Sequence, residues 1–188
     1  NDTLGVSLQD ILTTRQMDYA VFPVRQPELQ ASIKFVPMTR ETLMIGDIEV
    51  MALPHNHPVL TLGYSIAHRG KRVVYQSDHE PYCNPFPDAA EADRFAEEQN
   101  QIIVEFATGA DLLIADATYT PAEYETHRGW GHSSTLQVLE RAMAAKVKRL
   151  ALFHHDPTHS DEFLDKHLAE VRAQAAQVPW TTTLARLT

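Results

Sequence analysis

The chain has 188 residues, 44% of them hydrophobic, and its 16 basic and 25 acidic side chains give a net charge of −9. A chain of this size buries roughly 70% of its unfolded surface, so we expect one domain over residues 1–188. The negative charge disfavours broad attraction to nucleic acid or anionic lipid, and no apolar run approaches the roughly 20 residues of a membrane span.

The first part of the chain has a short helical segment followed by strands. Leu8, Ile11 and Leu12 share one helical face, which predicts a helix from Val6 to Gln16. The strands predicted from alternating and β-branched runs are Ile33–Val36, Thr42–Ile45, Ile48–Leu53, Val59–Ala67 and Arg72–Gln76. Gly46-Asp47 closes a tight hairpin between two of them, and the segment from His68 to Lys71 closes a second hairpin.

From residue 89 onwards, helices alternate with strands. The predicted helices are Ala89–Thr108, Ser134–Ala145 and Asp161–Gln177. The predicted strands are Leu112–Ala115, Arg149–Phe153 and an edge strand at Thr182–Ala185. Ser134 and Gln137 form a capping-box pattern at the start of the middle helix. The first part of the chain is thus rich in strands, and in the second part helices alternate with strands. This order predicts an α/β fold, with a mixed sheet and helices on its outer face.

Residues with metal-ligand chemistry lie just after three of these strands. They are His57, Asp78 and His154. Imidazole and carboxylate groups at the ends of separate strands are how a sheet protein brings ligands to a hydrolytic metal ion. We therefore predict that these three residues bind metal, against the simpler interpretation that each is an ordinary loop residue.

A further pair of residues predicts proton transfer. His132 precedes the helix Ser134–Ala145, where the positive end of the helix dipole is expected to keep the ring neutral. Asp116 ends the run DLLIAD and is the carboxylate that we expect to orient this ring. Ser133 and Ser134 are alternative nucleophiles, but sequence neighbours at a helix start rarely face each other and the sequence has no G-x-S-x-G elbow.

The order of several short motifs resembles one enzyme family. The segments HNHP, LGY, VVYQSDHE, DATYTPAEY, GWGHSS and LFHHDPTHSDEFLD are similar to the second half of metallo-β-lactamase-fold hydrolases, in the branch with ribonuclease Z and the phosphodiesterase-like enzymes. The resemblance runs from about Val21 to Asp165. It implies a metallo-β-lactamase-like sandwich of αββα layers and a metal-dependent hydrolase with two divalent ions, zinc or manganese.

The resemblance also implies a role for each candidate residue. His57 matches a histidine on the first metal, Asp78 the aspartate that bridges both ions, and His154 a histidine on the second metal. His155 is the alternative to His154, because the doubled histidine leaves the register open by one. Asp116 resembles the acidic residue of the related H-E-A-T motif, with Asp in place of Glu. His132 resembles the histidine that this acid supports near the scissile phosphate.

The family's H-x-H-x-D-H loop, which supplies four ligands, is absent from these 188 residues. We expect an upstream segment to carry it, so that the chain is a single metallo-β-lactamase-like domain that forms about the C-terminal two-thirds of a longer chain. The alternative is a non-catalytic sensory or scaffolding domain of this fold that binds a small phosphorylated ligand or a protein partner. If the chain is the whole molecule, the missing half exposes an apolar face, and we expect a homodimer or aggregates.

The substrate that we expect for the intact enzyme is a small phosphodiester, such as a cyclic nucleotide. Transfer-RNA processing is disfavoured, because a net charge of −9 and the lack of a basic Gly-rich arm give RNA little to hold. The single cysteine, Cys83, excludes an internal disulfide framework and fits a reducing, cytoplasmic compartment. Since its ligands are split between two ions, we expect the fragment alone to be inactive.

Overall fold

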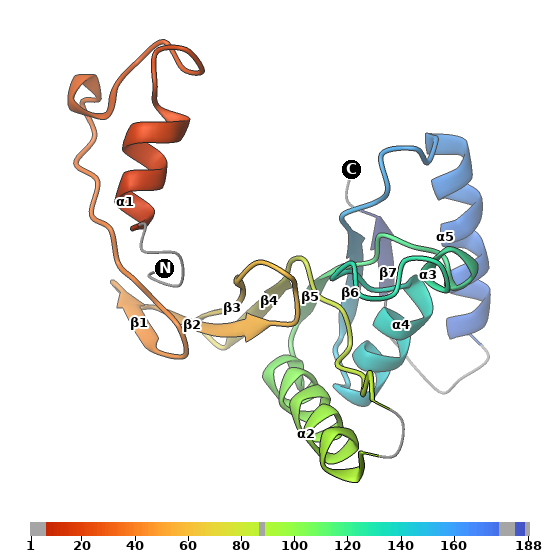
Figure 1. Ribbon diagram of the computed structural model, residues 1–188. Helices are drawn as coiled ribbons and strands as arrows, with labels where there is room; N and C mark the ends of the chain where they lie inside the picture. Colours follow the sequence, from red (N-terminus) through yellow and green to blue (C-terminus); the bar gives the residue numbers. More distant parts are fainter. Residues whose placement is uncertain (1–6, 87–88, 177–182, 187–188) are drawn as a thin grey trace. The chain divides into compact units, whose positions relative to one another are not determined.

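The computed structural model divides the chain into two compact units, Asn1–Thr39 and Arg40–Thr188. It describes residues 7–86, 89–176 and 183–186, the last of these as backbone only. Figure 1 shows the course of the chain through both units. Because a division by contacts does not by itself define a domain, the single-domain organisation stays a prediction.

The first unit holds one helical segment and an extended stretch. Its helical parts are α1 (Leu8–Asp10), a π-helix that continues it over Ile11–Gln16, and a 3-10 turn at Gln26–Glu28. The predicted helix is confirmed, except that Val6 lies outside the described residues. The strand predicted at Ile33–Val36 is wrong. This stretch has no regular structure, because none of the described strands pairs with it to satisfy its backbone.

Within the described residues, the second unit forms one seven-stranded sheet in the order β1 to β7. The strands are β1 (Thr42–Ile45), β2 (Ile48–His55), β3 (Thr61–His68), β4 (Lys71–Gln76), β5 (Leu112–Asp116), β6 (Arg149–Phe153) and β7 (Thr183–Arg186). Neighbours from β1 to β4 are antiparallel, whereas neighbours from β4 to β7 are parallel. β2, β4, β5 and β6 therefore point the same way, and their carboxyl ends meet at one edge.

Two tight turns set the register of the antiparallel part. β1 and β2 join at Gly46-Asp47, and β3 and β4 join at Arg69-Gly70. The second turn has φ values of 47° and 72°, the left-handed backbone that lets a two-residue turn follow the twist of its strands. Both predicted hairpins are confirmed. β3 begins at Thr61 rather than Val59, because the backbone of Val59 bonds the ring of His57 in the preceding loop.

Among the described residues, four helices accompany the sheet. They are α2 (Ala90–Ala107), α3 (Pro121–Tyr124), α4 (Thr135–Ala144) and α5 (Asp161–Ala175). Of these, α2, α4 and α5 share a core with one face of the sheet. Val74, Leu113 and Leu150 of the sheet share a buried core with Val138 of α4 and Val171 of α5. The predicted mixed sheet with helices on its outer face is thus confirmed. None of the described helices is both long and apolar enough to cross a membrane.

The predicted element ends agree closely with the structure where both exist. β2 continues two residues past Leu53, and β5 ends one residue later than predicted, at Asp116. The predicted end of the last helix, Gln177, and the predicted start of the last strand, Thr182, lie outside the described residues. The short helix α3 and the 3-10 turn at Gln26–Glu28 were not predicted from the sequence.

The opposite face of the sheet is apolar and only half-buried. Because side chains alternate along a strand, Val73, Tyr75, Ile114 and Phe153 point away from the helices. The rings of Tyr75 and Phe153 contact each other with centroids 5.6 Å apart. A sandwich fold places its second layer on such a face.

Candidate metal centre

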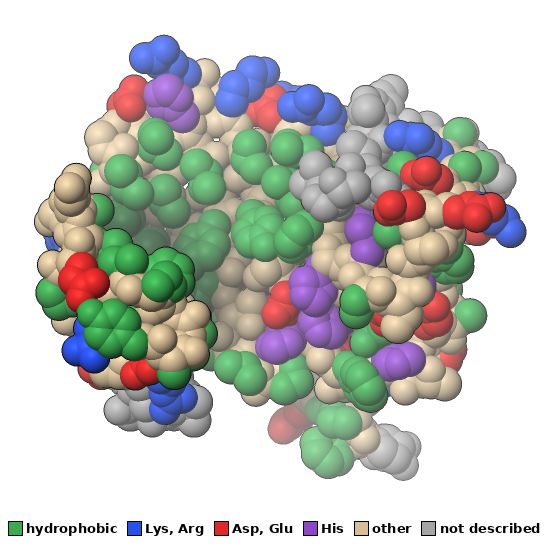
Figure 2. Space-filling view, turned by 90° about the horizontal axis from the view of Figure 1, so that it is seen from above, with side chains coloured by type: hydrophobic (Ala, Val, Ile, Leu, Met, Phe, Trp, Pro, Cys, Tyr) green, Lys and Arg blue, Asp and Glu red, His purple; other side chains and the backbone are tan. Residues whose placement is uncertain are grey.

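Five polar side chains gather at the edge where the carboxyl ends of the strands meet. His57 lies two residues after β2, Asp78 two residues after β4, Asp116 at the end of β5, and His154 directly after β6. His132, in the loop before α4, stacks on His154 with ring centroids 4.9 Å apart. Figure 2 shows histidine and acidic side chains gathered together on the face in view. The structure brings all five candidate residues of the sequence into one cluster.

Asp78 lies between two of the histidines. Its Oδ1 is 3.5 Å from Nε2 of His154, and its Oδ2 is 3.8 Å from Nε2 of His57. Asp78, His132 and His154 also offer ligand atoms that all lie within 4.8 Å of one another. One carboxylate thus presents a different oxygen to each of two imidazoles, which is a donor set that suits zinc and other borderline cations.

Hydrogen bonds hold Nδ1 of the His132 and His57 rings. Nδ1 of His132 lies 2.9 Å from Oδ2 of Asp116, which only accepts, so this nitrogen carries a hydrogen. Nδ1 of His57 lies 3.0 Å from the carbonyl oxygen of Val59 and 3.3 Å from its backbone N–H, and either contact leaves Nε2 directed toward Asp78. A histidine held through one nitrogen with the other unprotonated is the form that binds a metal ion.

Thr118 holds Nδ1 of His154. Its Oγ1 lies 2.7 Å from Oδ1 of Asp116 and 2.7 Å from the carbonyl oxygen of His154, both of which only accept. The hydroxyl therefore donates to one of them and accepts from Nδ1 of His154, 2.9 Å away. Nε2 of His154, the atom near Asp78, then keeps its lone pair. The sequence analysis missed Thr118, although a threonine two residues after a strand-end aspartate is a readable signal.

Asp116 is the buried centre of this network. Its side chain is fully buried and accepts hydrogen bonds from the backbone of His79 and Thr118 as well as from Thr118 Oγ1 and His132. The hydrogen bond to Asp116 raises the pKa of His132. This shift is opposite to the one expected from the helix dipole, because the carboxylate contacts the ring directly whereas the helix begins three residues later.

Backbone conformation separates His154 from its neighbour. His154 has φ 59°, a left-handed conformation that is uncommon outside glycine and costs energy unless the surroundings enforce it. His155 instead lines a small enclosed space between β6 and α5, together with His159 and His167. The geometry thus favours His154 over His155 as the residue beside Asp78.

The two serines of the alternative hydrolase interpretation are engaged elsewhere. Ser133 Oγ is buried and donates to the carbonyl oxygen of His79 at 2.6 Å. Ser134 is the N-cap of α4 and shares a capping box with Gln137, which confirms the predicted pattern. Both hydroxyls are thus engaged by groups other than a histidine side chain, and the structure gives no support to a serine nucleophile.

Comparisons with known proteins agree with this layout. The family model described as "Beta-lactamase superfamily domain" matches residues 11–155. Ribonuclease Z of Brevibacillus brevis is 32% identical over 116 residues, which are 62% of this chain and 31% of that protein. Ribonuclease Z of Pyrococcus furiosus is 36% identical over 93 residues, 49% of this chain and 24% of that protein.

A solved structure has the same fold. The metallo-β-lactamase fold protein YhfI from Bacillus subtilis superimposes with a TM-score of 0.54 at 19% identity, over 79% of this chain and 50% of that one. The chain thus spans less than a third of the length of the two ribonucleases Z.

Proposed function

Because this chain belongs to the β-lactamase superfamily, we propose that it is the metal-binding part of a hydrolase that cleaves phosphodiesters. One observation carries the proposal: His57 and His154 direct Nε2 toward the two oxygens of a single carboxylate, Asp78, while protein groups hold Nδ1 of both rings. A bound divalent cation supplies Lewis-acid polarisation of a phosphoryl oxygen and makes water a nucleophile near neutral pH.

We assign metal binding to His57, Asp78 and His154, with zinc or manganese as the ion. Asp78 offers one oxygen toward each histidine, which suits a carboxylate shared between two ions. Thr118 holds His154 in the tautomer that binds, and the backbone of Val59 holds the ring of His57 in place. These residues orient the ligands before any substrate arrives.

His132 has a different role in this proposal. Its hydrogen bond to the buried Asp116 favours the protonated ring, so it is suited to donate a proton to the leaving oxygen rather than to bind metal. Asp116 orients the ring and stabilises its positive charge, as a carboxylate does for the histidine of a catalytic triad. The stacked contact with His154 keeps the donor beside the metal ligands.

The remaining ligands of a two-metal site belong, in this proposal, to a part of the protein outside these residues. Three protein ligands shared between two ions leave both sites incomplete. The chain spans 31% of the Brevibacillus ribonuclease Z, so activity is a property that we propose for the longer protein.

A small phosphodiester is the substrate class that we propose. The relatives that are named ribonuclease Z support a phosphodiester as the scissile bond. The net charge of −9 argues against a long RNA, because phosphate contacts from lysine and arginine supply most of the affinity for nucleic acid.

Elemental analysis and a diesterase assay test the proposal together. The extended protein should retain divalent metal and hydrolyse bis(4-nitrophenyl) phosphate and a cyclic nucleotide faster than a precursor transfer RNA. Preferred cleavage of the precursor RNA would correct the substrate class and keep the reaction. An extended protein that retains no metal would overturn the hydrolase and favour the sensory or scaffolding domain.

A further inference from the structure

Glu80 is a buried carboxylate that lies next to the candidate site and has no role in it so far. It follows Asp78 by two residues and is 3% exposed. Among the residues that the structure describes, no lysine or arginine forms an ion pair with it. A buried carboxylate without a cation is costly unless strong donors surround it.

Three donors compensate the charge of Glu80. Its Oε1 accepts from the hydroxyl of Tyr124 and from the backbone N–H of Gly129, each at 2.8 Å. Its Oε2 accepts from the backbone N–H of Gly131, also at 2.8 Å. Burial is the main reason that the pKa of Tyr124 rises to about 12, so its hydroxyl remains a donor across the ordinary pH range. The carboxylate thus holds both ends of the segment Gly129–Gly131.

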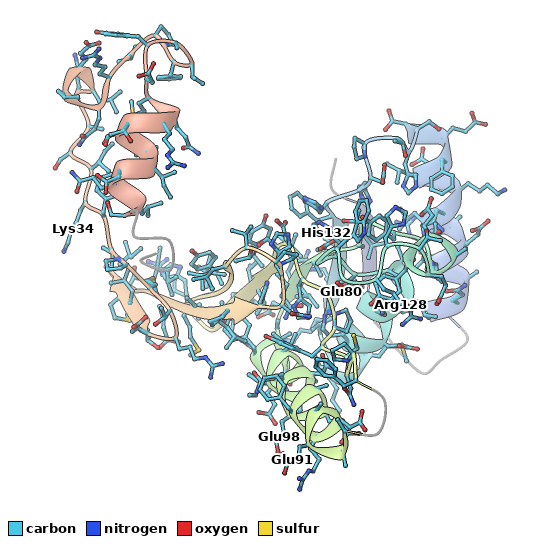
Figure 3. All side chains as sticks on the ribbon, in the orientation of Figure 1. Lys34, Glu80, Glu91, Glu98, Arg128 and His132 are labelled. Carbon is cyan, nitrogen blue, oxygen red and sulfur yellow. The ribbon has the colours of Figure 1, made fainter. Side chains whose placement is uncertain are left out.

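The clamped segment leads directly into the site. His132 follows Gly131, and Figure 3 shows the labelled Glu80 and His132 in the same part of the structure. Gly131 has φ 90°, and a Cβ built on it would lie 2.4 Å from Cδ2 of His57. The backbone held by Glu80 therefore packs against one candidate ligand and carries the candidate proton donor.

We propose that Glu80 is a positioning residue that fixes the Gly129–His132 loop relative to Asp78, and so aligns His132 with the metal ligands. The part of the inference that concerns catalysis by His132 rests on the proposed function. A carboxylate that only stabilises the loop would also be buried in this way. What points to positioning is that two of its three partners, Gly129 and Gly131, lie in the segment that leads into His132, and that Gly131 packs against the ring of His57. Displacement of a reacting group by about 1 Å can cost about 100-fold in rate.

Glutamine cannot replace Glu80 in this arrangement. The amide of Glu80→Gln has the same size but presents one acceptor oxygen and one NH₂ group. One of the two clamping oxygens would become a donor that faces another N–H, so at least one hydrogen bond is lost. Glu98→Gln is the matched control, because Glu98 lies exposed on α2 and Figure 3 shows it far from Glu80 in the view.

Amide hydrogen exchange measured by NMR on the metal-free chain tests the clamp without any assay of activity. We expect the N–H groups of Gly129 and Gly131 to exchange about 10-fold faster or more in Glu80→Gln than in the wild type. Glu98→Gln should leave both unchanged. Unchanged exchange at both glycines in a folded Glu80→Gln chain would overturn the inference. If that variant does not fold, Tyr124→Phe removes one donor, and faster exchange at Gly129 is then expected.

Steady-state kinetics of the extended, metal-loaded protein test whether Glu80 aligns His132 for catalysis. Glu80→Gln should lower kcat about 10- to 100-fold, with KM and metal content unchanged and a larger loss for poor leaving groups. Faster exchange at the glycines with an unchanged kcat would reduce Glu80 to a structural residue. An inactive wild-type protein would overturn the proposed function and, with it, the role of Glu80 in catalysis. The exchange result alone decides whether Glu80 holds the loop.

Discussion

The two edges of the parallel strands differ in what their carboxylates contact. At the amino-terminal edge, Asp111 accepts from Lys148 at 2.9 Å, from Lys71 at 3.1 Å and from the backbone of Arg72 at 3.0 Å. At the carboxyl-terminal edge, Asp78 lies 3.5 Å and 3.8 Å from two histidine nitrogens. No lysine or arginine pairs with Asp78 within the described ranges of the chain.

This difference separates a carboxylate used for stability from one available for binding. Asp111 has its charge compensated by side chains of its own chain, and so it needs no ligand. Asp78 faces the Nε2 atoms of two histidines, and a cation between them would contact all three groups at once. Strand ends in α/β sheets divide in this way, with function at the carboxyl ends and stability at the amino ends.

Asp78→Asn should give the largest effect. An amide binds divalent cations poorly, so we expect the extended protein to lose its retained metal and all measurable diesterase activity. The unfolding free energy of the metal-free chain should change by less than about 0.5 kcal/mol, since the side chain is partly exposed. Elemental analysis and urea unfolding measure both. Metal retained by this variant would contradict the distinction between Asp78 as a binding residue and Asp111 as a stabilising one.

His132→Ala should lower kcat about 100-fold and leave metal content unchanged. The loss should be largest for diesters whose leaving group is a poor alkoxide and smallest for 4-nitrophenolate, which departs without a proton. Rates with a series of leaving groups measure this dependence. An equal loss across the series, or loss of metal, would make His132 a ligand instead of a proton donor.

Thr118→Val should weaken metal binding about 10-fold, because it keeps the shape of the side chain but removes the acceptor for Nδ1 of His154. Thr108→Val is the control: Thr108 Oγ1 donates to the carbonyl oxygen of Val104 at the end of α2, away from the site. Titration of the extended protein with zinc gives both affinities. Equal affinities for the two variants would remove Thr118 from the site.

Asp111→Asn should have the smallest effect, confined to stability. Hydrogen bonds from Lys148, the backbone of Arg72 and Lys71 hold the pKa of Asp111 below its ordinary value. Its stabilising contribution is therefore present above the unfolded-state pKa of about 4 and is lost as pH falls through the lower folded-state pKa. We expect Tm to drop by about 1 to 3 °C at pH 7, with unchanged metal content. The difference should shrink below pH 4, and a constant difference at all pH values would contradict the ion-pair explanation.

The fold was readable from the sequence where local signals agree with long-range pairing. The turn at Arg69-Gly70 and the capping box of Ser134 and Gln137 are examples. Ile33–Val36 has strand-forming residues, but pairing is not a local property and no described strand accepts it. The helix α3 escaped detection because four residues are too short for a periodic pattern, although Thr120 and Glu123 form its capping box.

The candidate site also has parts that local sequence signals predict and parts that they do not. Positions at strand ends led to His57, Asp78, Asp116 and His154, since strands that point the same way place their ends together, and the start of a helix led to His132. Contacts across the chain were not readable: Thr118 bonds a residue 36 positions away, and Glu80 bonds Gly131, which is 51 positions away. The roles of all five residues stay predictions until metal content and rates are measured.

The spread of the cluster along the chain has a consequence for how the protein responds to metal. Because His57, Asp78 and His154 come from three separate strands, the unfolded chain cannot hold them together without a large loss of chain entropy. An ion at the proposed site would therefore bind the folded state almost exclusively, and by mass action it would shift the folding equilibrium toward that state. Resistance to proteolysis should then rise with the logarithm of free metal concentration, so that the supply of the ion also sets how much of the protein persists.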